Sequence, residues 1–222
     1  MRVSIHQPEH MPWRGFFQKM AKSDLCVVLD CVQYTKNNWQ NRNQFCTPKG
    51  KVFWLSVPVR IKGHLNKTIR EMEIDYSNNW INKYWKTLKM NYSKTPFFTY
   101  YAPKIKAILE SQPIFLWKLN TDLINLFRED LNICNDIIFA SELNPTGNKT
   151  ELILDICKKV KATTYISGQG GMRYLDLNLF SKHGIHVEFN HVQPKNNILP
   201  NFINLSFGHT LFHFGKEAKT LL

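Results

Sequence analysis

Two adjacent side chains near the amino terminus, His6 and Gln7, are of types that can do chemistry. They follow a short apolar run at residues 3–5 and precede aromatic residues at helical spacing within residues 13–20. An imidazole can take up a proton near neutral pH, so we interpret His6 as a general base, with Gln7 beside it as a second catalytic candidate. The alternative is a strand-end histidine that only bonds a carbonyl group.

A polar loop at residues 33–43 follows the second apolar run of the chain. Its amide groups donate and accept hydrogen bonds, and its arginine offers a planar fork, which together suit the hydroxyl groups and phosphates of a sugar nucleotide. Arg42 is the third catalytic candidate, as a stabiliser of a developing oxyanion or a departing phosphate. The alternative is an asparagine-rich network that bonds its own backbone.

The same part of the chain supplies further candidates for substrate binding. They are His10, Trp13, Asp30, Gln33, Lys36, Asn41 and Asn43. The loop residues among them leave the carboxyl end of the second predicted strand, next to the loop that carries His6. We therefore expect them to line the same crevice as His6.

A third group of residues could bind an anion. Residues 167–171 form a glycine-rich turn after an apolar run, and Lys149 precedes a helical pattern in which Asn148 and Glu151 fit a capping box. Glycine allows backbone N–H groups to approach an anion closely, and the amino end of a helix favours negative charge. The candidates are Lys149, Ser167, Gly168, Gly170, Gly171 and Tyr174, the last at a predicted helix start. Because the turn matches neither a Walker A loop nor a dinucleotide fingerprint, the alternatives are a packing-driven glycine turn and a simply capped surface helix.

One histidine pair has a spacing that can bind zinc from a helix. His209 and His213 lie four residues apart within the last predicted helical segment, residues 205–214. No glutamate follows the first histidine directly, and no third ligand is evident. We therefore predict no metal site and interpret the pair as partly buried histidines.

The elements that must position these side chains follow from hydrophobic patterning. The order strand, polar loop, helix, strand at the amino terminus predicts the opening unit of a parallel α/β sheet, which binds ligands at the carboxyl ends of its strands. Further strands are predicted at residues 44–47, 51–59, 69–74, 136–140, 164–166 and 186–189, and helices at residues 79–92, after Pro113 and from about residue 150. We predict a single α/β domain, 1–222, with a Rossmann-like, mostly parallel sheet, an inserted β-hairpin and a helical layer at about residues 79–131.

Composition limits the compartment and the partners. Five cysteines without a CxxC pair, and a start unlike a signal peptide, predict a reduced, cytoplasmic protein. No apolar run approaches the ~20 residues that span a bilayer, so membrane contact would be peripheral at most. The net charge of +12 favours acidic partners such as nucleotides, phosphorylated sugars and acyl carrier proteins. The basic residues are dispersed, however, so a merely soluble surface is the alternative.

Four stretches in a specific order carry a family resemblance. HQPEHMPWRGFFQKMAKSD, LDCVQYTKNNWQNRN, FWLSVPV and TYISGQGGMRYLD together resemble the WbqC-like protein family of bacterial gene clusters for O-antigen and other surface polysaccharides. The resemblance runs over nearly the whole chain and implies a pathway more than a reaction. The family more often has an acidic residue at the position of Cys31, which argues against a cysteine nucleophile there.

The start of the chain is also similar in pattern to the adenylyl-transferring α/β proteins, in which an HxGH motif opens the first helix. Here the corresponding residues are Trp13-Arg14-Gly15-Phe16, without either histidine. The similarity supports a Rossmann-like sheet. It supports nucleotidyl transfer only if His6 or His10 takes the place of the missing histidines.

The resemblance and the candidate residues together predict an enzyme of surface-polysaccharide biosynthesis. It would transfer or ligate an acyl or aminoacyl group, such as glycyl, onto the amine of a nucleotide-linked amino sugar. ATP, an acyl carrier protein or a coenzyme A thioester would activate the acyl group. The alternative is a non-catalytic sugar-nucleotide-binding or scaffold subunit of the same pathway. Nucleic-acid binding ranks last, because no motif for specific nucleic-acid recognition is present.

Overall fold

The computed structural model describes residues 1–192 and 204–222, which form two compact units. Of the described residues, unit 1 comprises Met1–Gln7, Gly15–Cys31 and residues 133–192. Unit 2 comprises Pro8–Arg14, Val32–Asn132 and residues 204–222. Each unit is described by itself below.

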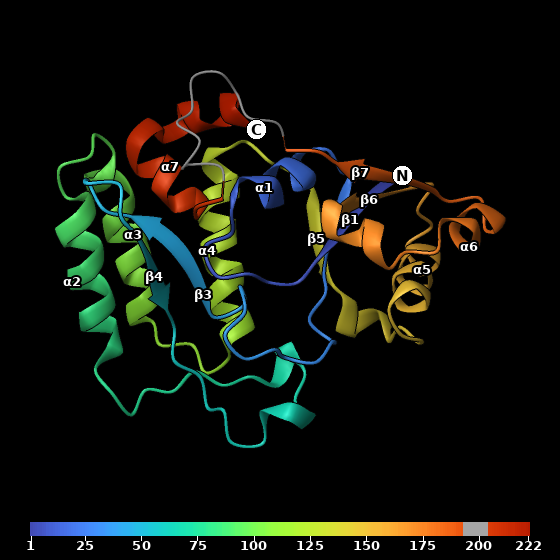
Figure 1. Cartoon of the computed structure of the whole chain (residues 1–222), viewed down its shortest axis with the longest axis horizontal. Helices are drawn as coiled ribbons and strands as arrows, with labels where there is room; N and C mark the ends of the chain where they lie inside the picture. Colours follow the sequence, from blue (N-terminus) through green and yellow to red (C-terminus); the bar gives the residue numbers. More distant parts are fainter. Residues whose placement is uncertain (193–203) are drawn as a thin grey trace. The chain divides into compact units, whose positions relative to one another are not determined.

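Unit 1 is built on a parallel sheet (Figure 1). Its strands are β1 (Arg2–His6), β2 (Leu25–Val28), β5 (Asp136–Phe139), β6 (Thr164–Gly168) and β7 (His186–Asn190), in the spatial order β5-β2-β1-β6-β7. All four pairings are parallel, so every carboxyl end lies at the same edge. The α/β class and the Rossmann-like sheet predicted from the sequence are confirmed.

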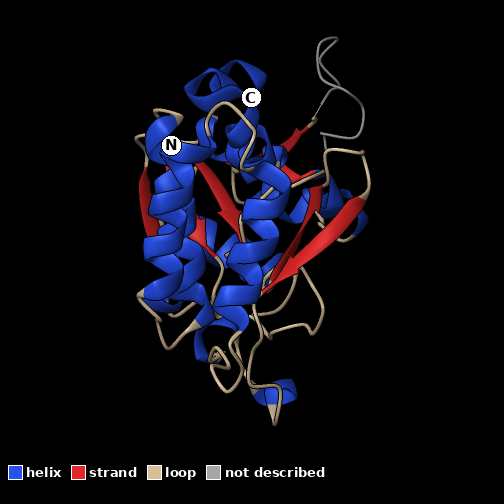
Figure 2. Cartoon of the chain, turned by 90° about the vertical axis from the view of Figure 1, so that its left-hand side faces the viewer, coloured by secondary structure: helices blue, strands red, loops and turns tan. Residues whose placement is uncertain are grey.

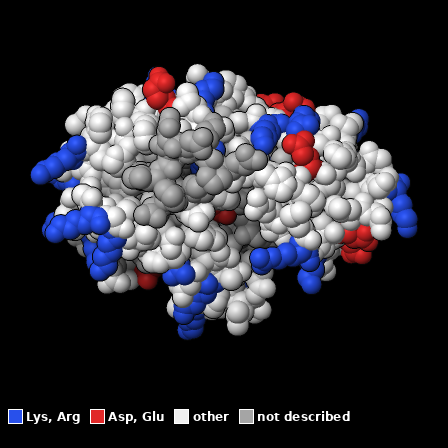
Figure 3. All heavy atoms as spheres, turned by 45° about the horizontal axis from the view of Figure 1, so that its top comes forward, with Lys and Arg blue, Asp and Glu red and all other residues white. Residues whose placement is uncertain are grey.

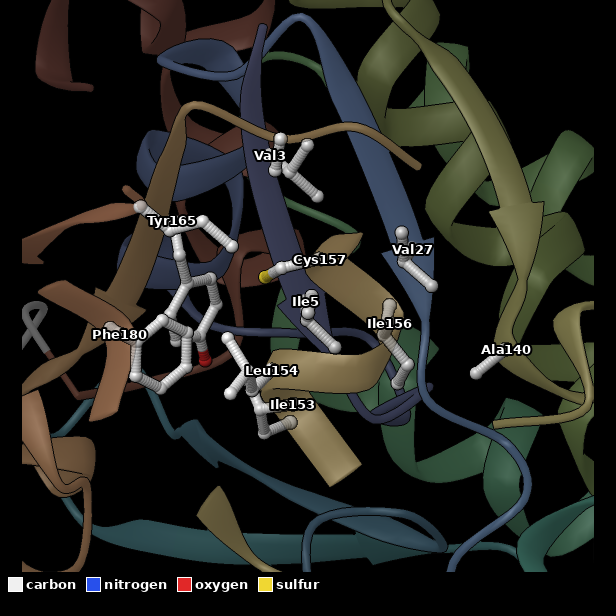
Figure 4. Packing of buried hydrophobic residues seen from close by; sticks show 12 residues of the cluster. Val3, Ile5, Val27, Ala140, Ile153, Leu154, Ile156, Cys157, Tyr165 and Phe180 are labelled. Atoms are coloured by element: carbon white, nitrogen blue, oxygen red, sulfur yellow. The ribbon is translucent and has the colours of Figure 1, made fainter. Parts of the chain in front are cut away.

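Apolar side chains hold helices against this sheet. The helices of the unit are α1 (Arg14–Ala21), which begins at the border with unit 2, α5 (Thr150–Lys159) and α6 (Leu177–Lys182), with the 3₁₀ turns η3 (Ala140–Leu143) and η4 (Gln169–Arg173). Val3, Ile5 and Val27 of the strands share one buried cluster with Ile156 of α5 and Phe180 of α6 (Figure 4). Full burial of such a side chain contributes about 1.5–3 kcal/mol, so this cluster fixes the sheet and the loops at its edge.

Unit 2 combines a hairpin with helices (Figure 2). The antiparallel hairpin consists of β3 (Arg42–Cys46) and β4 (Val52–Ser56), and Gly50 supplies the positive φ of 81° that its turn requires. The helices are α2 (Trp80–Tyr92), α3 (Phe98–Glu110), α4 (Leu116–Asp130) and α7 (Phe207–Phe214), with the 3₁₀ segments η1 (His64–Asn66), η2 (Ile69–Glu71) and η6 (Gly215–Leu221). The predicted hairpin and the helices within residues 79–131 are confirmed.

The strand predicted at residues 69–74 is wrong. Its first part is η2, because Glu71 accepts hydrogen bonds from both the backbone N–H and the hydroxyl of Thr68, each at 2.8 Å, and closes a capping box. The remainder makes only the isolated bridges Val59↔Ile74 and Glu73↔Phe115. The alternation of apolar residues suggested a strand, but among the described residues no continuous partner strand pairs with residues 69–74.

The charged surface shows no single basic patch in the view of Figure 3, where lysines and arginines lie dispersed among uncharged residues. This agrees with their scattered positions in the sequence. Within residues 1–192 and 204–222, no helix has both the length and the apolar character needed to cross a bilayer.

Candidate functional site

The strand order of unit 1 reverses between β1 and β6, and the pairing of these two strands ends early. β1 stays paired with β2 as far as His6↔Val28, and β6 with β7 as far as Gly168↔Asn190. The last pair between β1 and β6, in contrast, is Ser4↔Ile166. The carboxyl ends of β1 and β6 therefore part at the position where open α/β sheets bind ligands. We call this position, with His6, Gln7, Ser167 and Gly168, the switch point.

The imidazole of His6 is kept neutral there. Burial lowers its pKa most, the positive charge of Lys19 lowers it further, and a hydrogen bond to the Gln7 carbonyl acts weakly in the opposite direction. His6 Nδ1 lies 3.1 Å from that carbonyl oxygen, which can only accept, so Nδ1 carries the proton and the lone pair is on Nε2. The ring packs edge-on against Phe16, with 4.7 Å between centroids. His6 thus has the protonation state of a general base.

Lys19 is fixed close to His6 by a bond to the same strand. Its side chain is only 4% exposed, and Nζ donates to the Ile5 carbonyl at 2.8 Å. Sequence reasoning missed this residue because a lysine in a helical pattern is usually an exposed one.

On the other side of the switch point, the glycines of the 167–171 turn have different reasons to be glycine. A Cβ at Gly168 or Gly170 would meet nothing within 4 Å. A Cβ at Gly171 would come within 2.1 Å of the Ser167 hydroxyl, so that glycine is required by packing. Ser167 is itself buried and donates to the Gly168 carbonyl at 3.1 Å. There is room for a side chain at Gly168 and Gly170, whereas Gly171 is required by packing.

The amino end of α5 is tied to the end of this turn. The Thr150 hydroxyl donates to the Tyr174 carbonyl at 2.9 Å and accepts from the Asp176 N–H at 3.3 Å. Lys149, exposed and directly before α5, is thereby held near the segment that follows η4. That Lys149 and the glycine turn bind the same anion stays a prediction.

Two local predictions in this region are wrong. Lys149, with φ 49°, takes the cap position of α5 and makes no side-chain cap bond, so the capping box of Asn148 and Glu151 does not form. Tyr174 is not at a helix start but ends η4. Helix α6 begins only at Leu177, because Asp176 caps it by accepting from the Leu179 N–H.

Asp30 holds the neighbouring loops instead of facing solvent. It is fully buried, and its carboxylate accepts from the Ser141 N–H at 2.9 Å and from the Ser141 hydroxyl at 2.7 Å. These bonds join the loop after β2 to the loop after β5. Burial, together with the charge of Asp30, raises the pKa of the Cys31 thiol, so a thiolate nucleophile is disfavoured.

His10 is part of a buried network in unit 2. Its Nδ1 lies 3.1 Å from Asn120 Oδ1 and its Nε2 lies 2.8 Å from the Tyr84 hydroxyl. Because Asn120 Nδ2 donates to the Pro8 and Gln40 carbonyls, its Oδ1 is an acceptor and His10 Nδ1 donates. Burial lowers the pKa of His10 to about 4. That His10 binds substrate stays a prediction.

The polar loop residues mostly bond the main chain of unit 2. Gln33 donates to the Leu65 carbonyl, Asn41 to the Val57 carbonyl, and Asn43 to the carbonyls of His10 and Met11. Arg42 donates to the Asn37 carbonyl and lies over the Trp54 ring at 4.2 Å, whereas Lys36 is exposed. These bonds are those of the turn-network alternative. That the loop lines the same crevice as His6 stays a prediction.

Unit 2 also contains a cavity whose lining sequence reasoning largely missed. We call it the tryptophan pocket; its volume is about 410 Å³, and it is lined by Glu9, Trp13, Trp39, Gln44, Trp54 and Asn204. Only Trp13 was a candidate from the sequence. The other residues come from four separate segments, and no local spacing relates them.

The histidine pair of α7 is embedded in aromatic side chains. His209 Nδ1 lies 2.7 Å from the Tyr92 hydroxyl, and the His209 and His213 ring centroids are 4.7 Å apart. Burial and the neighbouring His213 lower the pKa of His209 to about 3. In the described parts of the chain, no group of three or more His, Cys, Asp or Glu residues could hold a metal ion.

Comparisons with known proteins give a family but no activity. The model of the WbqC-like protein family matches residues 7–220. A curated protein of Mycobacterium tuberculosis (strain ATCC 25618 / H37Rv), the uncharacterized protein Rv1507c, is 35% identical over 187 residues, which cover 84% of this chain and 80% of that protein. No solved structure matches the chain.

Proposed function

Because the chain belongs to the WbqC-like protein family, we propose that it is an enzyme of surface-polysaccharide biosynthesis that transfers an acyl or aminoacyl group onto the amine of a nucleotide-linked amino sugar. The observation that carries this proposal is the neutral His6 at the switch point, where β1 and β6 part and β6 leads into the glycine turn. A base and a set of anion-binding N–H groups are the two parts that amide formation requires.

The chemistry assigns one step to each part. His6 Nε2 takes a proton from the sugar ammonium, and the freed nitrogen lone pair attacks the carbonyl carbon of the activated acyl group. The carbonyl π electrons move to oxygen, and the glycine turn and Lys149 stabilise the resulting negative charge. The C–N bond is retained when the tetrahedral intermediate collapses and the bond to the leaving group breaks. The excess proton on the new amide nitrogen is released to the leaving group or to solvent.

The leaving group is either a thiolate or a nucleoside monophosphate, depending on whether the acyl group arrives as a thioester or as an adenylate. Both donors carry phosphates, and the net charge of +12 suits either. We therefore propose a specific acyl acceptor, the amino sugar, and two classes of acyl donor, thioester and adenylate.

A two-stage experiment tests this function. Thermal shift measurements with a panel of nucleotide-linked amino sugars select a ligand. Mass spectrometry then follows that ligand in the presence of acyl thioesters, or of ATP with free carboxylic or amino acids. We expect a mass increase equal to one acyl group. Binding without a mass change with any donor would contradict the enzyme and support the non-catalytic subunit.

A further inference from the structure

The tryptophan pocket has walls that are tied together by main-chain hydrogen bonds. The His10 N–H donates to the Trp39 carbonyl at 2.8 Å, and the Ser206 N–H donates to the Gln44 carbonyl at 2.8 Å. Ser206 also bridges to Trp13, and Gln44 is the direct partner of Trp54 in the hairpin. The lining residues are thus held in place before any ligand arrives, which lowers the cost of binding.

The segment that carries Glu9 is also fixed by side-chain hydrogen bonds. Asn43 donates to the His10 and Met11 carbonyls at 3.1 and 2.8 Å, and Asn120 donates to the Pro8 carbonyl at 2.8 Å. Met11 adopts a φ of 41°, a conformation that a non-glycine residue keeps only when its surroundings impose it. The hydrogen bonds of Asn43 and Asn120 therefore hold the segment in the conformation that places Glu9 in the lining of the pocket.

The aromatic side chains of the pocket remain partly open. Trp39 and Trp54 are 38% and 41% exposed, and their ring centroids are 5.2 Å apart at a tilt of 41°. The Arg42 guanidinium lies over the Trp54 ring and restrains it. Indole surface left open and held rigid in a cavity is typical of a binding platform.

The polar residues of the pocket limit the ligand. They are one carboxylate, Glu9, which is 9% exposed, and two carboxamides, Gln44 and Asn204. None of the six described lining residues is basic, and Glu9 places a carboxylate against any phosphate in the pocket. The Arg42 guanidinium lies over the Trp54 ring. Carboxamides and a carboxylate can together satisfy hydroxyl groups, which both donate and accept.

We infer that the tryptophan pocket is a subsite for a sugar ring. The C–H groups of a pyranose carry partial positive charge and pack on the electron-rich faces of indoles, while its hydroxyl edge meets Glu9, Gln44 and Asn204. A volume of about 410 Å³ lies in the range of small-molecule sites. This inference rests on the proposed function for the identity of the sugar, an amino sugar.

Titration calorimetry with three probes tests the subsite: a nucleotide-linked amino sugar, the same nucleotide without the sugar, and the free amino sugar. The variants are Trp39→Ala, which removes one of the two partly exposed rings, and the isosteric Glu9→Gln. The control is Trp117→Ala, because Trp117 also has an arginine, Arg70, over its ring at 3.9 Å but does not line the pocket. Circular dichroism and melting curves check that each variant is folded.

We expect Trp39→Ala and Glu9→Gln to weaken binding of the sugar-bearing probes by roughly tenfold or more, a change of about 1.4 kcal/mol, and to leave the bare nucleotide unaffected. Trp117→Ala should change none of the three. Equal weakening for the bare nucleotide would overturn the inference in favour of a base-binding pocket, and unchanged binding in both folded variants would overturn it outright. If Trp39→Ala does not fold, Glu9→Gln alone decides.

The outcomes separate this inference from the proposed function. If wild-type protein transfers an acyl group while the pocket variants bind the sugar normally, the subsite is wrong and the activity stands. If the pocket variants lose sugar binding while no donor gives a product, the subsite stands and the activity is wrong.

Discussion

Two effects set the charge of the His6 imidazole. Burial lowers its pKa most, and the ammonium of Lys19 lowers it further, so the ring remains neutral below its ordinary pKa of 6.5. A group with a lowered pKa gains its proton, and loses its function as a base, only as the pH falls through the lowered value. His6 is thus unprotonated at neutral pH but weakly basic, which suits an amine that is itself easily deprotonated.

The pH profile of acyl transfer should show this effect. For the wild-type protein we expect kcat/KM to fall only below pH 6.5, and Lys19→Met should move this acidic limb to higher pH because one positive charge near His6 is removed. Burial remains in the variant, so the shift is partial. Lys22→Met, on the same segment, is the control. An acidic limb at the same pH in all three proteins would contradict the role of Lys19.

The glycine turn offers a test at single residues. Gly170→Val should keep the melting temperature within a few degrees, because its Cβ meets open space, and should weaken binding of a nucleotide sugar by at least tenfold, because the side chain would occupy the space of the anion. Gly171→Ala should instead lower the melting temperature, since its Cβ would lie 2.1 Å from the Ser167 hydroxyl. Calorimetry and melting curves measure both effects. Normal binding by Gly170→Val would leave the turn a purely structural one.

Among the secondary-structure elements, sequence patterns predicted those whose formation depends mainly on the burial of apolar residues. The strands of unit 1 contain short runs of apolar residues, and this patterning predicts β1, β2, β5, β6 and β7, although β5 and β7 are only partly buried. Sequence patterns failed where a local backbone geometry decides the structure. Glu71 closes a 3₁₀ turn within a predicted strand. Lys149 takes the cap position of α5 that Asn148 was expected to fill. The strand order, and with it the switch point, depends on long-range pairing that one sequence does not reveal.

The candidate site shows the same division. The sequence makes His6 and the glycine turn candidates because each stands at the end of an apolar run, and their roles in catalysis stay predictions. The tryptophan pocket could not, because Trp39, Gln44 and Trp54 meet only through the hairpin and the bonds of Ser206. His10, predicted from the sequence to bind substrate, is fully buried and hydrogen-bonded to Asn120, and neither composition nor spacing reveals this burial.

The buried histidines of unit 2 make its stability depend on pH. The pKa of His10 is lowered to about 4 and that of His209 to about 3, so the unfolded chain binds their protons first as the pH falls below 6.5. For each histidine, this protonation of the unfolded chain should lower the free energy of unfolding by about 2 kcal/mol between pH 7 and pH 5. Urea unfolding at the two pH values measures this. His10→Gln should reduce the loss, whereas the exposed His183→Gln should not; an equal loss in all three proteins would refute the assignment.

At the scale of the whole molecule, the findings are the family and the net charge, and neither of them specifies a reaction. The chain is a WbqC-like protein over residues 7–220 and carries a net charge of +12. On the face shown in Figure 3 the basic residues are dispersed, which suits small acidic ligands better than an extended polyanion. The substrate class we propose, a nucleotide-linked amino sugar with an activated acyl donor, is of this small and acidic kind.

We propose that the switch point of unit 1 carries out acyl transfer with His6 as its base. The most direct test is the rate of acyl transfer to a nucleotide-linked amino sugar, followed by mass spectrometry, in wild type, His6→Ala and His186→Ala. His186 is the matched control, because it lies in the same sheet but at the amino end of β7, the opposite edge. We expect His6→Ala to lose roughly 10²–10⁴-fold in kcat with sugar binding retained, and His186→Ala to keep the wild-type rate. A His6→Ala protein that is folded and active within a few-fold of wild type would contradict the claim.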